Sequence, residues 1–342
     1  MTVLSSTILS QDTTATVLPD CWGHRGASAA FPENTLASFE LAIKDGAEGI
    51  ETDVHVSADD VILMFHDPDL SRTTNGKGKI KERNWHGPDG MQHIKTKKEP
   101  IQSIPTFAET IAFLMKPENR HVTLNLDVKP HNEVTRIFTL MNDTITAQPD
   151  WQTALAPRIL LGLWHPKFIK VAKEVLPYCR RAHIGWSIDV ARRYFWDDVD
   201  TFSIAMCVLA SPEGRRFLEE CKKCDKQVAV WTVNTKEEMV EACRWGVDVI
   251  ITDHTKTWLD LRRTLSGKPS PGSIVSATQY RLEFAGDYDS MSSQYSTLFY
   301  WTDFRYWTPF LWLINYLGTR RLEGLAGPLS LKEVDGVAEV VS

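Results

Sequence analysis

Between Cys21 and Ser266 the chain alternates short apolar runs with segments of helical period, and this alternation constrains the fold more than any other feature. Eight runs have the pattern of strands, and they are CWGH, GIETDVHV, VTLNLDVK, RILLGLW, AHIGWSI, SIAMCVL, VAVWTVN and DVIITD. Most are followed by a helix-like stretch such as PEGRRFLEECKKC. Eight strands alternating with helices is the count of a closed parallel barrel. We therefore expect a (β/α)8 TIM barrel over residues 21–266, with a doubly wound open sheet as the alternative.

One apolar run, VILMFHD at 61–67, interrupts the alternation, because only SADD separates it from the second strand. Four residues are too few for a crossover helix, so the pattern predicts a β-hairpin on an extended second strand. A turn centred between Asp59 and Asp60 would place Asp53 opposite His66. The hairpin is thus expected to return His66 to the level of the acidic strand end.

The regions outside the barrel differ from it in composition. Residues 1–20 are rich in serine and threonine, which predicts a flexible lead-in, and residues 267–297 begin GKPSPG, which predicts a linker. Residues 298–321 are apolar and rich in aromatic residues, although Asp303, Arg305 and Pro309 interrupt them, and residues 322–342 form a tail. This pattern favours a segment at the headgroup level of a membrane over a spanning helix. Packing on the barrel and self-association are the alternatives.

Charge and cysteine usage exclude some classes of function. The net charge of −6 gives no general attraction to nucleic acid, so we expect no nucleic-acid partner. The six cysteines are scattered and no signal-peptide pattern opens the chain, which favours an intracellular, reducing location. Cys221 and Cys224 form a C-x-x-C in a helix-like segment without a second pair nearby, so we expect ordinary thiols instead of a zinc site.

Polar residues close several of the predicted strands, and the active site of a parallel barrel lies at the carboxyl ends of its strands. They are His24 and Arg25 after the first strand, Glu51 and Asp53 on the second, His66 and Asp67 on the hairpin, Asp127 and Lys129 on the third, and Trp231 and Asn234 at the seventh.

The acidic residues of this set predict a metal site. Glu51 and Asp53 are two apart on a strand, so both point to one face. Two buried carboxylates are costly unless a cation neutralises them. Asp127, on the next strand, would supply a third carboxylate. An all-oxygen set favours Mg²⁺ or Ca²⁺, with Mn²⁺ as a further candidate. Structural salt bridges with lysine and arginine are the alternative for each pair.

The basic residues of the set predict phosphodiester cleavage. His24 and His66 suit a general acid and a general base, because neutral and protonated imidazole coexist near pH 7. Arg25 offers a planar fork of donors that matches a phosphate, and Lys129 adds a second cation at the same mouth. Together with a divalent ion these groups describe a metal-dependent phosphodiesterase.

The ordered motifs of the chain resemble those of the glycerophosphodiester phosphodiesterase family. GHRG, PENT, ETD and FHD follow one another as in that family, and LDVK, VWTVN and IITD extend the resemblance over roughly residues 20–265. It implies the following roles: His24 and His66 as the acid and base, Arg25 and Lys129 as phosphate ligands, and Glu51, Asp53 and Asp127 as metal ligands. Asp127 stands where most members have Glu. Glu33 and Asn34 match PENT, and Asn34 either serves the site or caps the following helix.

No domain is inserted between HDPDLSRTT and IPTFAETIAFL, and an aromatic tail follows the barrel. Together with this tail, the motifs LNLDVK, GLW, SIDVA and WTVN resemble the fungal phosphatidylglycerol phospholipase C branch of the family. That branch implies hydrolysis of phosphatidylglycerol, a glycerophospholipid, to diacylglycerol and glycerol phosphate. From the aromatic segment at 298–321 we also expect a protein held on the cytosolic face of a membrane or lipid surface, for which the endoplasmic reticulum, the mitochondrion and the lipid droplet are candidates. The alternatives are hydrolysis of soluble glycerophosphodiesters, a lysophospholipase D and a non-catalytic lipid-binding module. The acid, the base, the nucleophile (water or a headgroup hydroxyl) and the oligomeric state stay open.

Overall fold

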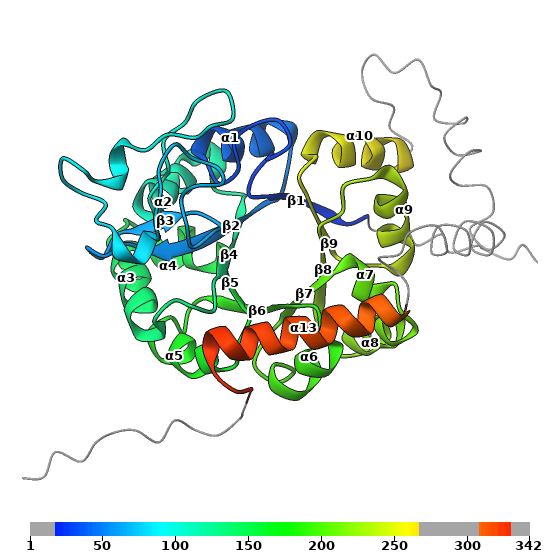
Figure 1. The fold of residues 1–342 in the computed structure, drawn as a ribbon. Coiled ribbons are helices and arrows are strands. Elements are labelled where there is room, and N and C mark those ends of the chain that lie inside the picture. The colour runs from blue at the N-terminus through cyan, green and yellow to red at the C-terminus, as the bar shows by residue number, and fades with distance from the viewer. Residues whose placement is uncertain (1–17, 267–307, 330–342) are drawn as a thin grey trace, which may run out of the picture.

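Figure 1 shows the computed structural model of the chain, which describes residues 18–266 and 308–329. A barrel of parallel strands forms its centre: β1 Asp20–His24, β2 Gly49–Val56, β4 Thr123–Val128, β5 Ile159–Leu163, β6 Arg180–Gly185, β7 Thr201–Ala205, β8 Gln227–Trp231 and β9 Val249–Thr252. These strands are hydrogen-bonded in the order β1-β9-β8-β7-β6-β5-β4-β2, and β1 also pairs with β2. That last pairing closes the ring, so the predicted TIM barrel is confirmed and the open sheet is excluded.

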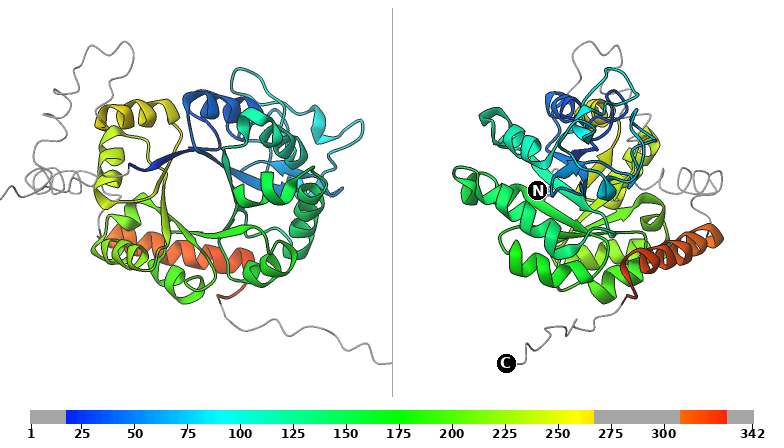
Figure 2. Two further views of the ribbon diagram at one scale, coloured as in Figure 1. Left: turned by 180° about the vertical axis from the view of Figure 1, so that it is seen from behind. Right: turned by 60° about the vertical axis from the view of Figure 1, so that its left-hand side comes forward.

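Helices cover the outside of the strands in Figure 1 and in the rear view of Figure 2. They are α1 Leu36–Asp45, α2 Phe107–Met115, α3 Val134–Thr146, α4 Trp151–Ala154, α5 Lys167–Val175, α6 Ile188–Tyr194, α7 Met206–Leu209, α8 Pro212–Lys223, α9 Lys236–Trp245 and α10 Thr255–Leu265. Four single 3₁₀ turns lie at Ile80–Glu82, Met91–His93, Pro117–Asn119 and Ala156–Arg158. Alternate strand residues such as Ile50 and Leu124 pack outward against the helices, whereas Trp22, Leu160 and Ala229 form a separate cluster inside the barrel.

Local signals set the bounds of the helices that flank the first and last strands. Thr35 caps α1 and Thr235 caps α9, each in a capping box, and both helices end at a glycine in the left-handed region, Gly46 and Gly246. The C-x-x-C pair lies at the end of α8, where Cys221 is buried and Cys224 is exposed, and both are free thiols.

The hairpin after β2 is present, but its register differs by one residue from the prediction. β3 (Ile62–Met64) runs antiparallel to β2 and pairs Met64 with Val54. Ser57 N–H donates to Val61, so the loop has three residues centred on Asp59. Phe65, and not His66, therefore lies opposite Asp53. The N–H of Phe65 donates to the carbonyl of Asp53 at 2.9 Å. The chain leaves the ladder after this bond, and His66 still reaches the barrel mouth.

A further helix, α13 (Thr308–Ala326), lies across one end of the barrel, in front of it in Figure 1. It includes residues 308–321 of the predicted membrane segment and continues for five residues into the predicted tail. Residues 1–17 of the predicted lead-in, the linker at 267–297, residues 298–307 and residues 330–342 of the predicted tail lie outside the described residues. β1 begins at Asp20, the last residue of the predicted lead-in. No helix within residues 18–266 and 308–329 is both long enough and apolar enough to cross a membrane.

Candidate active site

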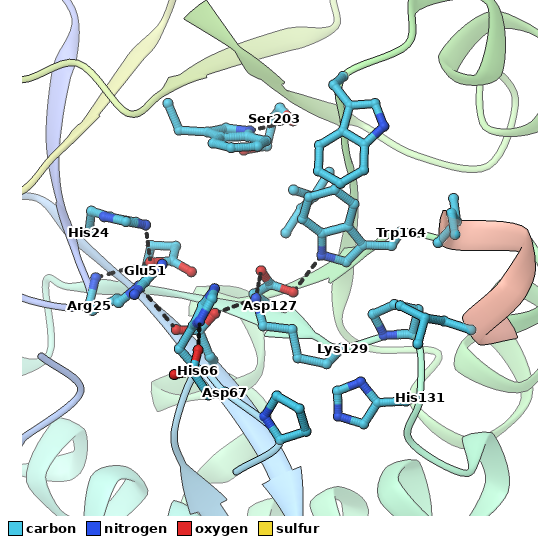
Figure 3. Close-up of a pocket in the computed structure, with 18 of the residues that line it drawn as sticks. His24, Arg25, Glu51, His66, Asp67, Asp127, Lys129, His131, Trp164 and Ser203 are labelled. Atoms are coloured by element: carbon cyan, nitrogen blue, oxygen red, sulfur yellow. Dashed lines mark hydrogen bonds and ion pairs between the residues drawn. The ribbon is translucent and has the colours of Figure 1, made fainter. Parts of the chain in front are cut away.

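A cavity of about 340 Å³ opens at the carboxyl ends of the barrel strands (Figure 3). The predicted site residues that line it are His24, Arg25, Glu51, Asp53, His66, Asp67, Asp127, Lys129 and Trp231. The other three, Glu33, Asn34 and Asn234, do not line the cavity but contact residues near it. The parallel barrel thus gathers side chains from distant parts of the chain at one mouth.

Three carboxylates form the floor of this cavity. Glu51 and Asp53 lie on one face of β2, and Asp53 stands beside Asp127 in the register of β2 with β4. Each of the three offers an oxygen within 4.8 Å of the others, and all three residues are buried. These three residues are the predicted set of oxygen ligands.

Two cationic side chains neutralise part of this charge. Nζ of Lys129 lies 2.6 Å from Oδ1 of Asp53 and 2.6 Å from Oδ2 of Asp127. Nε of Arg25 lies 3.4 Å from Oδ2 of Asp53, and its Nη1 lies 2.9 Å from Oε1 of Glu33. Lys129 and Arg25 therefore stand beside the carboxylates, where a bound phosphate could reach both of them.

The cations beside the three carboxylates stabilise the negative charge of Asp53 more than that of Glu51 or Asp127. Despite burial, Lys129 and Arg25 hold the pKa of Asp53 well below its usual range. Burial and the charge of Asp53 raise the pKa of Glu51 to about 8, and burial raises that of Asp127. Three buried carboxylates with oxygens within 4.8 Å of one another are costly unless a cation neutralises them. The donor set therefore fits a divalent ion held by Glu51, Asp53 and Asp127, and its all-oxygen chemistry suits Mg²⁺, Ca²⁺ or Mn²⁺.

Each of the two predicted catalytic histidines has a carboxylate on Nδ1. In His24, Nδ1 lies 2.7 Å from Oδ1 of Asp253, and in His66 it lies 2.7 Å from Oδ1 of Asp67. A carboxylate accepts only, so Nδ1 carries the proton and Nε2 is the nitrogen free to exchange one. Nε2 of His24 lies 3.9 Å from Oε2 of Glu51. Both imidazoles are thus oriented for acid or base work at the cavity.

The surroundings of the two histidines differ. Burial opposes the charge on His24, but the hydrogen bond with Asp253 and the charge of Glu51 raise its pKa above the ordinary value. For His66 burial dominates, and it lowers the pKa together with Lys129 and Arg25, although Asp53 opposes this. The two rings therefore differ in proton affinity, as an acid and base pair requires.

Asn34 does not cap α1, so the structural alternative for this residue is wrong. Thr35 takes the N-cap position, because its hydroxyl accepts from the N–H of Ser38. Asn34 instead donates through Nδ2 to Oδ2 of Asp53 at 2.8 Å, and its Oδ1 accepts from the hydroxyl of Thr52 at 2.7 Å. The side chain of Asn34 does not line the cavity but fixes the position of the Asp53 carboxylate, which does.

The same arrangement recurs at the other end of the barrel sequence. Asn234 donates to Oδ2 of Asp253 at 2.6 Å and accepts from the hydroxyl of Thr252 at 3.1 Å. In both copies the asparagine lies 19 residues before the aspartate and directly before the threonine that caps the helix between them. The sequence interpretation did not single out Asp253. The repeated N-T…T-D spacing is the signal that identifies it.

Arg72 is a second residue that the sequence interpretation left out. Its guanidinium donates to Glu33, at 2.6 Å from Oε1 and 3.0 Å from Oε2, and its Nε donates to Asp67. Glu33 in turn binds Arg25, and Asp67 binds His66. Arg72 therefore links the carboxylates that orient a predicted phosphate ligand and a predicted catalytic histidine. The SRTT run that holds it begins seven residues after the end of β3.

Three tryptophans form the wall opposite the histidines. Nε1 of Trp164 donates to Oδ1 of Asp127 at 2.6 Å, and Nε1 of Trp231 donates to the carbonyl of Ser203 at 2.9 Å. The ring centroid of Trp164 lies 4.8 Å from that of Trp186 and 5.9 Å from that of Trp231. The cavity is thus lined by charged side chains around Glu51 and Lys129 and by these aromatic rings, and Arg321 of α13 also lines it.

Comparison with known proteins agrees with this fold and shows the family to which the chain belongs. Residues 24–257 match the Glycerophosphoryl diester phosphodiesterase family. A glycerophosphodiester phosphodiesterase of Caldanaerobacter subterraneus is 26% identical over 255 residues, which cover 70% of this chain and 96% of that protein. Human glycerophosphodiester phosphodiesterase 1 is 34% identical over 112 residues, which cover 32% of this chain and 33% of that protein.

Solved structures show the same fold. An Oleispira antarctica phosphodiesterase in complex with the product sn-glycerol-3-phosphate superposes with a TM-score of 0.59 at 22% identity, covering 72% of this chain and 97% of that one. A glycerophosphodiester phosphodiesterase from Agrobacterium tumefaciens gives a TM-score of 0.56 at 19% identity, covering 71% and 99%. The family match spans more than half of this chain, which therefore belongs to the glycerophosphoryl diester phosphodiesterase family and is a phosphoric diester hydrolase.

Proposed function

We propose that the protein hydrolyses glycerophosphodiesters, yielding glycerol phosphate and the alcohol esterified to it. The observation that carries this proposal is the pair of histidines, each with a carboxylate on Nδ1, facing one cavity that also holds Lys129, Arg25 and the acidic cluster. The names of the relatives add support, because those of Caldanaerobacter subterraneus and human origin are called glycerophosphodiester phosphodiesterases.

The chemistry follows from the positions of the side chains. Arg25 and Lys129 bind the non-bridging phosphate oxygens through charge-assisted hydrogen bonds. One histidine accepts a proton through Nε2 from the attacking water, and the other donates a proton to the leaving alcohol oxygen as its bond to phosphorus breaks. If the glycerol 2-hydroxyl attacks first, a water molecule then opens the resulting cyclic phosphate to give the same glycerol phosphate. The family depends on a divalent metal, which Glu51, Asp53 and Asp127 would hold and which would polarise the phosphoryl oxygen.

The direct test is incubation of the protein with glycerophosphoethanolamine and Mg²⁺ or Ca²⁺, followed by identification of both products. We expect glycerol phosphate and ethanolamine in equal amounts, with release slowed by at least about 10²-fold when His24 is replaced by Ala. Release of phosphoethanolamine and glycerol would show cleavage of the other ester bond. Absence of either product with any glycerophosphodiester tried would contradict the proposal.

A second candidate is the phospholipase C reaction on phosphatidylglycerol. It rests on α13, whose outer surface exposes Trp312, Leu313, Tyr316 and Leu317, at 68%, 43%, 50% and 54%. Such a surface could contact a lipid layer beside the cavity, as residues 298–321 were expected to do. Incubation with mixed phospholipid vesicles tests it: specific loss of phosphatidylglycerol with appearance of diacylglycerol is expected, whereas release of a phosphorylated lipid would indicate a lysophospholipase D.

A further inference from the structure

The loop after β4 places a second pair of histidines beside the candidate active site. His131 lines the cavity, and its Nε2 lies 2.9 Å from Nδ1 of His55 on β2. Nε2 of His55 in turn lies 3.0 Å from the carbonyl oxygen of His66. A chain of two imidazoles therefore runs from the cavity to the backbone of a predicted catalytic histidine, and the proposed reaction uses neither ring.

Asn132 fixes the loop that carries His131. Its Nδ2 donates to the carbonyl of Val54 at 3.0 Å and to that of Lys129 at 3.1 Å, and its backbone N–H also donates to the carbonyl of Lys129. Asn132 itself is buried. The loop is thus tied to both β2 and β4, which holds the ring of His131 in place before a substrate binds.

The partners of the two rings decide where their protons lie. A carbonyl oxygen only accepts, so Nε2 of His55 carries a proton. His55 is 3% exposed, and no carboxylate in the described part of the chain bonds to its ring, so the ring is neutral and its Nδ1 accepts. Nε2 of His131 therefore donates to Nδ1 of His55.

The remaining nitrogen of this chain, Nδ1 of His131, is an acceptor at the cavity. Burial and the positive charges of Lys129, Lys81 and Lys167 lower the pKa of His131 to about 4, so at neutral pH Nδ1 carries a lone pair and no proton. None of the described residues bonds to this nitrogen, and protein atoms do not enclose it. The two nitrogens of an imidazole point in divergent directions, so Nδ1 faces away from the buried His55. Figure 3 shows the ring beside the side chain of Lys129.

This acceptor differs from the side chains that would hold the phosphate. Arg25 and Lys129 are donors only, and they match the non-bridging phosphate oxygens. A phosphodiester carries no proton at neutral pH, so its oxygens cannot bond to a lone pair on Nδ1 of His131. A hydroxyl group can, because it donates.

We propose that His131 determines specificity for a hydroxyl group of the substrate, which donates to Nδ1 of His131 while Arg25 and Lys129 hold the phosphate. The inference rests on the proposed hydrolysis of glycerophosphodiesters and assigns it a further specificity residue. Two hydroxyls have the required chemistry: the one on carbon 1 of the glycerol, and one carried by the leaving alcohol. A neutral hydrogen bond of this kind corresponds to roughly a fivefold difference in kcat/KM.

The test compares kcat/KM for three esters. They are glycerophosphoethanol, its 1-deoxy analogue 2-hydroxypropyl ethyl phosphate, and glycerophosphoglycol, in which ethylene glycol replaces ethanol. If the glycerol supplies the hydroxyl, wild-type kcat/KM should be about fivefold higher for glycerophosphoethanol than for the 1-deoxy analogue. If the leaving alcohol supplies it, glycerophosphoglycol should be favoured over glycerophosphoethanol by this factor. All three esters keep the 2-hydroxyl, so the comparison does not depend on which nucleophile attacks.

Two substitutions of His131 separate the acceptor from the contact with His55. The amide nitrogen of His131→Gln can take the place of Nε2 and donate to His55, but the variant has no group at the place of Nδ1. It should reduce the ratio to about twofold or less. His131→Asn puts an amide oxygen near the place of Nδ1 and should keep more of the ratio. His121→Gln, at an exposed position outside the cavity, is the matched control and should keep the wild-type ratio. Melting curves check that all variants are folded.

The outcomes separate the two levels of the proposal. If the wild-type protein hydrolyses none of the three esters, the proposed function itself is wrong. Equal kcat/KM for all three, or a ratio that His131→Gln leaves unchanged, refutes the role of His131 and leaves the proposed function standing. An equal loss of the ratio in His121→Gln refutes it as well. A ratio that is lost only when Nδ1 is removed supports the role, and the pair of esters that shows it identifies the hydroxyl that binds.

Discussion

Nδ1 of His24 lies 2.7 Å from Oδ1 of Asp253, although 229 positions separate the two residues in the chain. The barrel brings them together because β1 pairs with β9, so the end of the last strand lies beside the end of the first. Ser28 and Asn234 also donate to this carboxylate, which fixes its orientation. We infer that Asp253 is a positioning residue that turns Nε2 of His24 toward the cavity.

Replacement of Asp253 by Asn should therefore impair catalysis without removing the side chain. The amide can donate to Nδ1, which favours the tautomer with the proton on Nε2 and misplaces the proton that the reaction needs. We expect kcat to fall by roughly 10²-fold with little change in KM. Asp189→Asn, on the exposed side of α6, is the control. An unchanged kcat and pH profile would show that Asp253 has only a structural role.

Loss of either histidine should have an effect of similar size. His24→Ala and His66→Ala are each expected to lower kcat/KM by at least about 10²-fold, because each removes one of the two proton-transfer groups. Circular dichroism should show a folded barrel in both variants. A folded double variant that retained full activity would contradict the mechanism.

Arg72 provides a test of how Glu33 and Asp67, the carboxylates that orient Arg25 and His66, are held in place. Its guanidinium binds Glu33 through two nitrogens and Asp67 through a third, a geometry that a lysine ammonium group cannot reproduce. We expect Arg72→Ala to lower kcat/KM by roughly tenfold, with Arg72→Lys restoring only part of it. Full recovery in the lysine variant would mean that charge alone matters.

Much of the fold could be predicted because its signals are local. Each strand is a short apolar run, and Thr35 with Gly46 marks both ends of α1. The predicted hairpin register was wrong by one residue, because the length of the loop depends on which two backbone groups form the hydrogen bond that closes it. The N–H of Ser57 bonds to Val61, and the left-handed backbone of Asp60 completes the loop. The pattern of apolar residues does not indicate which of the two loop lengths forms.

The site was predictable only where a motif ended a strand that was already recognised. The acidic pair on β2 stood out because two carboxylates share one face, whereas Asp253 and Arg72 each resemble an ordinary polar residue until the barrel closes. Packing of α13 on the barrel was one of the alternatives, but the place where it packs could not be predicted. Its position depends on Gly318 meeting Trp186, a contact between residues 132 apart that no spacing rule describes.

The acidic cluster predicts stabilisation by metal. An ion that binds only the folded protein at one hundred times its Kd adds about 2.7 kcal/mol to the free energy of unfolding. For a barrel of this size that raises the melting temperature by about 5 °C or more. We expect Mg²⁺ or Ca²⁺ to produce this shift after treatment with EDTA, and Glu51→Gln to abolish it. Glu237→Gln on the exposed start of α9 is the control, and equal shifts in both variants would argue against the site.

His183 gives a prediction about stability that is independent of catalysis. Its side chain is 1% exposed and stacks on Phe195 with 4.0 Å between ring centroids. Burial lowers its pKa from 6.5 to about 3. The unfolded chain therefore takes up a proton near pH 6.5 that the folded chain binds only near pH 3, so stability is lost as the pH falls through this window, by about 1.4 kcal/mol per pH unit.

His183→Leu removes this titrating group and puts an apolar side chain of similar size in its place. Between pH 7 and pH 5 the free energy of unfolding of the variant should therefore improve relative to wild type by about 2 kcal/mol, as measured by urea unfolding at both pH values. His121→Gln, at an exposed position, should follow the wild-type pH dependence. A different result would be a free energy of unfolding that depends on pH in the same way in the wild type and in the His183→Leu variant. The folded protein would then bind the proton on His183 as readily as the unfolded chain does. Burial of the neutral imidazole would not be the cause of acid sensitivity.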